Sequence, residues 1–183
     1  MRTWEQLADL PVEIESYELE ALERDVSSDF TRLSTVIHLR GLGEEGVGED
    51  VTYDGVDHIA LQDAGPNLPL AGSHTLASFS ELVGRLDLFP TAPEREVSRL
   101  YRRWAFESAA LDLALRQAGR PLHEVLGREP RPVTFVVSLR LGRWPGLATA
   151  AACAAAWDLS NHLAGVPGSG SAIGLANLLV MAV

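Results

Sequence analysis

The sequence predicts an α+β fold in which an antiparallel hairpin sheet is followed by a layer of helices. Residues 31–40 alternate Leu33, Thr35 and Ile37 with more polar positions, as a half-buried strand does. A glycine-rich stretch, residues 41–46, follows and predicts a hairpin turn. Residues 91–119 have apolar side chains at helical spacing instead. Strands followed by helices are typical of the α+β class.

The strands are expected in the first third of the chain. Residues 12–22 fit either a strand or a helix, and we favour a strand. The other expected segments are a loose lead-in (1–10), a polar loop (25–30), the strand 31–40 and its returning partner (47–53).

The clearest helix signal lies in residues 91–119, where Thr91 is a plausible cap and Gly119 ends the periodic run. Its main stripe is predicted to face the core: Val97, Leu100, Tyr101, Trp104, Leu111 and Leu115. Phe106 and Leu113 point to the opposite side, so the helix is expected to be buried on two faces. If nothing covers the Phe106/Leu113 face, we expect self-association through it.

Three further segments are predicted around this helix. The polar residues 54–73 form a stretch long enough to suggest a binding loop. Residues 73–88 and 121–126 suit short helices. Residues 133–141 are apolar enough for a strand buried on both faces, the type found in parallel sheets and barrels.

Composition limits the classes of function. A net charge of −10 argues against binding to nucleic acid, whose phosphates would be repelled. The sequence has no lysine, and its single cysteine, Cys153, excludes an internal disulfide. No basic segment followed by an apolar run opens the sequence, so we expect no signal peptide, and the last apolar run is too short to cross a bilayer. We therefore expect a cytoplasmic protein with no membrane partner.

The character of the chain changes after residue 142. Only Arg143 and Asp158 are charged in residues 143–183, a segment rich in alanine and glycine. It shows no amphipathic stripe, so we expect it to be disordered or translated out of frame, for example after a frameshift.

Several motifs suggest chemistry but have simpler interpretations. Residues 41–46 match G-x-G-x-x-G, yet no helix follows, so a hairpin turn is favoured over dinucleotide binding. Four residues carry metal-ligating groups at spacings that match no known site: Asp54, Asp57, His58 and Asp63. Glu107 and Asp112 suit ion pairs with Arg103 and Arg116 at four-residue spacing. His38 and His123 are expected to be structural, so we predict no catalytic, cofactor or metal residue.

The order of these segments resembles the N-terminal capping domain of the enolase superfamily, in its mandelate racemase/muconate-lactonizing branch. Residues 43–49, GEEGVGE, resemble the family's turn into a G-x-G-E-like strand. Residues 103–113, RWAFESAALDL, with Gly119 to Leu122 and then Leu126 and Gly127, are similar to its long capping helix and the step into the barrel. Residues 133–141 then look like the first strand of a β/α barrel.

The resemblance implies a domain over residues 1–130, a first barrel strand over 131–142 and the tail 143–183. In that family two loops close the active site, here residues 25–31 and 50–73. The candidate substrate-loop residues are Asp25, Phe30, Asp50, Tyr53 and Asp54.

In intact relatives a lysine or histidine of the barrel removes the proton α to a carboxylate, and Mg²⁺ stabilises the enediolate. These relatives are racemases, cycloisomerases and dehydratases of small carboxylates. This chain lacks the lysine and the later strands, so the resemblance implies a truncated, inactive relative without its own Mg²⁺. The alternative is a stand-alone α+β binding or interaction module that uses residues 54–73.

Overall fold

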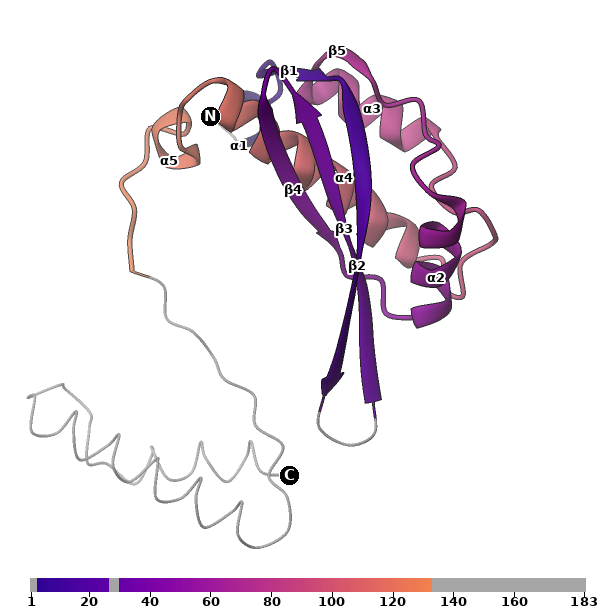
Figure 1. The fold of residues 1–183 in the computed structure, drawn as a ribbon. Helices are drawn as coiled ribbons and strands as arrows, with labels where there is room; N and C mark the ends of the chain where they lie inside the picture. The colour runs from indigo at the N-terminus through magenta and orange to yellow at the C-terminus, as the bar shows by residue number, and fades with distance from the viewer. Residues whose placement is uncertain (1–2, 27–29, 133–183) are drawn as a thin grey trace, which may run out of the picture. The chain divides into compact units, whose positions relative to one another are not determined.

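The computed structural model describes residues 3–26 and 30–132, and its contacts divide the chain after Arg131. The first unit is α+β, with its helices on one side of an antiparallel sheet (Figure 1). The predicted strand 133–141 and the tail 143–183 lie outside the described residues.

A three-stranded sheet organises the domain. It consists of β2 (Ser16–Val26), β3 (Phe30–Gly41) and β4 (Glu44–Asp50), in the order β2-β3-β4 with antiparallel pairing. The predicted strand at residues 31–40 is therefore confirmed. Between β3 and β4, Leu42 and Gly43 have φ values of 52° and 78°. A two-residue turn with both φ values positive is a type I′ hairpin turn, which explains the glycine-rich motif without a nucleotide.

The boundaries of two strands differ from the prediction. β4 begins at Glu44 and ends at Asp50, whereas the sequence suggested residues 47–53, because the tight turn returns the chain at once. β2 continues to Val26 and β3 begins at Phe30, so Asp25, Val26 and Phe30 of the predicted loop 25–30 are strand.

A second, two-stranded sheet pairs β1 (Pro11–Ile14) with β5 (Gly72–Thr75). The prediction of extended structure over residues 12–22 is confirmed, as β1 and the start of β2. The lead-in prediction was wrong, because α1 (Thr3–Leu7) forms there and buries Leu7 against the core.

The prediction of a long loop over residues 54–73 was also wrong. α2 (Gly55–Ala64) occupies its first half, and β5 begins at its end. The residues that α2 buries are Asp57, His58 and Leu61. Two of these three are polar, so the helix has no apolar stripe that a search for periodicity could find.

The remaining helices follow the predicted order. α3 (Leu76–Arg85) begins with a capping box between Thr75 and Ser78, and α5 (Leu122–Val125) precedes Gly127. α4 (Ser98–Gln117) runs behind the sheet and packs mainly on β4 and β3 (Figure 1). It begins several residues after the predicted cap at Thr91.

The prediction that the main stripe of α4 faces the core was wrong, whereas the expected burial of Phe106 and Leu113 is confirmed. Leu100 and Trp104 are 51% and 55% exposed, whereas Phe106 and Leu113 are fully buried. The reason lies in β4, where Gly46 and Gly48 leave no room for a Cβ against the α4 backbone. The helix therefore turns its alanines, Phe106 and Leu113 to the sheet, since small residues allow the closest approach.

This burial removes the basis for self-association through Phe106 and Leu113. Both side chains are covered within the domain, and Tyr17 of β2 packs edge-on against Phe106 with ring centroids 6.1 Å apart. Within residues 3–26 and 30–132, no helix is long and apolar enough to cross a membrane.

Candidate functional site

A fully buried arginine joins three parts of the domain. Arg102 of α4 donates from Nε to Asp50 Oδ2 at 2.7 Å and from its other nitrogens to the carbonyls of Asp57 (2.7 Å) and Leu88 (3.1 Å). Its guanidinium also stacks on Phe89, 3.7 Å from the ring centroid. One side chain thus fixes the end of β4, α2 and the segment before α4 to the long helix, and buried charges are tolerated only with such full pairing.

A buried histidine continues this network. His58 Nε2 lies 2.9 Å from the Thr52 carbonyl and must donate to it, while Nδ1 lies 3.0 Å from Thr35 Oγ1. Because Thr35 Oγ1 already accepts from Gln62 Nε2, its own hydroxyl can donate to Nδ1. Thr52 in turn donates from its backbone and its hydroxyl to Asp50 Oδ1. The base of the loop after β4 is therefore held rigidly.

The network shows that one candidate site residue, Asp50, was wrongly assigned, and it includes two of the four residues with metal-ligating groups. Asp50, a candidate substrate-loop residue, is fully buried and bound to Arg102, so it cannot contact a ligand from this position. Asp57 and His58 face the interior, whereas Asp63 is exposed. In the part of the chain that the structure describes, no group of three or more His, Cys, Asp or Glu side chains could hold a metal ion.

Next to this base, a cluster of aromatic and arginine side chains lies at the surface, with Phe30 and Tyr53 exposed and Arg32 half-buried. Phe30 of the β2–β3 hairpin stacks on Tyr53, with ring centroids 6.3 Å apart and planes 23° apart. The guanidinium of Arg95 lies 4.8 Å from the Tyr53 centroid and that of Arg32 lies 5.8 Å from it. We call Phe30, Arg32, Tyr53, Asp54 and Arg95 the lid cluster.

The charges of the lid cluster are unevenly compensated. Arg95 Nε lies 3.0 Å from Asp54 Oδ2 and forms an ion pair with it. Arg32 donates to the Val51 carbonyl at 2.9 Å and has no carboxylate partner among the described residues. The cluster therefore presents two aromatic rings beside one arginine whose charge is available to an anion.

The structure thus brings together three of the five candidate residues: Phe30, Tyr53 and Asp54. Asp25 stays on the hairpin, where it accepts a hydrogen bond from the Thr31 hydroxyl at 2.8 Å. The sequence did not point to Arg32 and Arg95, because each joins the cluster only through tertiary contacts.

The outer face of the sheet is occupied by ion pairs. Arg40 contacts Glu18 and Glu45 at 2.7 and 2.8 Å, and His38 lies 3.0 Å from Glu20. The hydrogen bond from Arg40 lowers the pKa of Glu45 below its usual value. His38 thus has a role in this charged face, while His123 lies exposed on α5.

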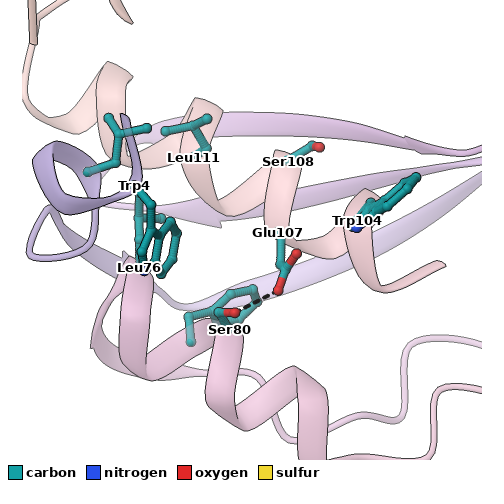
Figure 2. Close-up of a pocket in the computed structure, with 9 residues that line it drawn as sticks. Trp4, Leu76, Ser80, Trp104, Glu107, Ser108 and Leu111 are labelled. Carbon is teal, nitrogen blue, oxygen red and sulfur yellow. Dashed lines mark hydrogen bonds between the residues drawn. The ribbon is translucent and has the colours of Figure 1, made fainter. Parts of the chain in front are cut away.

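A small apolar groove of about 210 Å³ lies between α1, α3 and α4 (Figure 2). Its walls include Trp4, Leu76, Phe79, Trp104 and Leu111. Glu107 accepts from Ser80 Oγ at 2.6 Å and from Arg103 Nε at 2.8 Å. The predicted pairs Arg103–Glu107 and Asp112–Arg116 are confirmed.

One family model matches residues 5–125, which include the lid cluster and the whole three-stranded sheet. Its description is "Domain of unknown function (DUF8230) N-terminal domain". The chain belongs to this family. No curated protein and no solved structure matches it. The DUF8230 N-terminal domain match ends at α5, shortly before the described residues end.

Proposed function

We propose that this domain is the cap of an active site carried by another domain, in an enzyme resembling the enolase superfamily. The observation that carries the proposal is the lid cluster, in which Phe30 from a hairpin end and Tyr53 from a neighbouring loop stack on the surface. These are the two segments that close the active site in the family that the sequence resembles.

The position and exposure of the β2–β3 hairpin support a role as a lid. The end of β2 and the start of β3 project beyond the helices in Figure 1, and β2 is exposed from Ala21 to Val26. Tyr53, by contrast, sits on a loop whose base is fixed by Asp50 and Arg102. A projecting hairpin beside a fixed aromatic anchor suits closure over a ligand, since closing lids exclude water from the reacting groups.

The family description supports the presence of a second domain, because it names an N-terminal domain. Among the described residues, no cluster of three or more His, Cys, Asp or Glu side chains could hold Mg²⁺. The sequence has no lysine that could act as a base. In this proposal the cap therefore contributes binding and water exclusion. Arg32 attracts the substrate carboxylate, while Phe30 and Tyr53 cover its apolar part.

A chimera tests this function. In the chimera, residues 1–142 replace the corresponding part of a DUF8230 family member that has a further domain after it. Exchange of the substrate α-proton is then measured in D₂O with Mg²⁺. We expect the chimera to catalyse exchange, and Tyr53→Ala to lower kcat/KM at least about tenfold. The control Ile59→Ala changes an exposed residue of α2 outside the cluster.

Two results would overturn the proposal that this domain is a cap. One is a folded chimera that exchanges no α-proton of any small carboxylate offered. The other is a Tyr53→Ala chimera as active as the Ile59→Ala control. A free-standing interaction module is the second candidate, and the exposed apolar face of α4 favours it.

A further inference from the structure

The outward face of α4 carries an apolar stripe that nothing in the described residues covers. Val97, Leu100 and Trp104 are 44%, 51% and 55% exposed, although they lie at core-like helical spacing. Ser108 and Leu111 continue the line, and Trp4 of α1, 52% exposed, flanks its far end. We call Val97, Leu100, Trp104, Ser108 and Leu111 the outer stripe. Contiguous exposed apolar side chains of this kind mark interaction surfaces.

We propose that the outer stripe binds the outer stripe of a second copy of this chain, with the two α4 helices antiparallel and the two-fold axis beside Trp104. This proposal goes beyond the cap, and neither depends on the other. The spacing of the stripe supports it, because Val97 and Leu111 each lie seven residues from Trp104, and Leu100 and Ser108 each lie four. Under such an axis a large side chain meets a smaller one, Leu100 against Ser108 of the copy.

The charges beside the stripe also suit a second copy. Two ion pairs close within α4, Arg103–Glu107 at 2.8 Å and Asp112–Arg116 at 3.0 Å, and a third joins Arg99 to Glu96, just before the helix, at 3.1 Å. Each of these three acidic groups is matched by an arginine of α4. Two copies can therefore approach here without repulsion, although the chain as a whole carries a net charge of −10.

The groove gives the copy a place to anchor. It lies between Trp4, Trp104, Ser108 and Leu111, the half of the stripe that the antiparallel arrangement sets against Val97 and Leu100 of the copy (Figure 2). At about 210 Å³ it is smaller than the roughly 300–1,000 Å³ of small-molecule pockets. It has room for one or two side chains, so Leu100 of the copy is the natural occupant.

The size of the outer stripe determines how strongly two copies are expected to bind each other. From Val97 to Leu111 the helix rises roughly 20 Å, and its width is about 10 Å. Even with the groove walls this is less than the roughly 800 Å² per partner of a standard stable interface. We therefore expect a concentration-dependent dimer rather than a permanent one.

Sedimentation velocity of the full chain across a concentration series tests the proposal. We expect a monomer–dimer equilibrium that Trp104→Ser and Leu100→Glu each weaken at least about tenfold, as loss of a central anchor does. Both residues are exposed, so circular dichroism should show unchanged folds. The control Ile59→Ser, on α2 and 48% exposed, should dimerise like the parent chain.

Cysteine pairing tests the orientation. Leu100→Cys and Ser108→Cys chains, each carrying Cys153→Ser, are mixed and oxidised. We expect disulfide-linked heterodimers in excess over either homodimer, because the proposed axis places residue 100 opposite residue 108.

A chain that stays monomeric at all concentrations would overturn the proposal and leave the stripe to another partner. So would a dimer that Trp104→Ser and Leu100→Glu leave intact, since its interface would lie elsewhere. Homodimers in excess over heterodimers would overturn the antiparallel arrangement.

Discussion

Arg102 connects three separate parts of the domain. Its three hydrogen-bonding nitrogens reach β4, α2 and the Leu88 carbonyl, and its flat face lies on Phe89. An arginine suits this position because a planar guanidinium can donate in several fixed directions and still stack on a ring. The loop that carries Tyr53 depends on this side chain through Asp50.

We expect Arg102→Met to lower the free energy of unfolding by about 3–5 kcal/mol, because it leaves Asp50 buried without its cation. Urea unfolding followed by circular dichroism measures the change. Asp50→Asn combined with Arg102→Met should recover part of the loss, since the unpaired charge is gone. As a control, Arg116→Gln breaks a largely exposed pair and should cost no more than about 1 kcal/mol. Equal losses for Arg102→Met and Arg116→Gln would refute the role given to Arg102.

Tyr17 makes stability dependent on alkaline pH. Burial raises the pKa of Tyr17 above its ordinary value of 10.0, although its oxygen also accepts from the Leu68 N–H. The folded state therefore holds this proton more tightly than the unfolded chain does. The resulting stabilisation is present in full below pH 10, where both states are protonated, and is lost as pH rises through the folded pKa.

Absorbance at 295 nm should show one of the three tyrosines ionising later than in the unfolded chain. Tyr17→Phe should remove that late step. If all three tyrosines of the native protein ionise together near pH 10, the phenol of Tyr17 is not buried as described.

At the scale of elements, the contact between β4 and α4 determines the fold. A Cβ on Gly48 would collide with the backbone at Ala105, and one on Gly46 would collide with Ala109 and Leu113. The strand and the helix therefore meet backbone to backbone, which is why the helix buries alanines and exposes Trp104. The glycine pattern of the hairpin thus has two causes, the I′ turn at Gly43 and this close approach.

Gly48→Ala should lower the free energy of unfolding by about 3 kcal/mol or more, because a rigid backbone cannot yield as a side chain does. Gly84→Ala is the matched control. Its Cβ would meet only the flexible end of Arg103, and alanine favours a helix by up to about 1 kcal/mol. Thermal and urea unfolding of both variants measure the difference. A Gly48→Ala protein as stable as the parent would contradict the close approach.

The sequence predicted the elements whose signals are local. β3 has β-branched alternation, the turn after it has glycine, and α3 has periodic apolar residues. α2 was missed because Asp57 and His58, not apolar residues, face the interior. The main stripe of α4 was wrongly expected in the core because the helix is apolar on both sides, and the glycines of β4 decide which side meets the sheet.

Only part of the candidate site could be predicted from the sequence. Phe30, Tyr53 and Asp54 were found by the place of their loops in a resemblance, which is a matter of order along the chain. Arg32 and Arg95 could not be found, since nothing in the sequence places two residues 63 positions apart on one ring. Asp50 was misplaced because its partner, Arg102, lies 52 residues away in a helix whose phase was not known.

At the scale of the molecule, the residues that the structure describes form three surfaces of different character around one core. The outer face of the sheet is covered by ion pairs such as Arg40–Glu18 and stays solvated. The lid cluster and the outer stripe instead expose aromatic rings. In this account the first contacts a ligand and the second contacts another protein chain. In this account the domain binds and covers, while the chemistry belongs to another domain.

The measurement that tests this most directly is α-proton exchange by the chain alone. Candidate small carboxylates are incubated with it in D₂O and Mg²⁺, and deuterium incorporation is followed by NMR. We predict no exchange above the buffer rate, because the described residues provide no metal-binding group and the sequence has no lysine base. Exchange that survives repurification and disappears with EDTA would contradict the account and show a catalytic site within this chain.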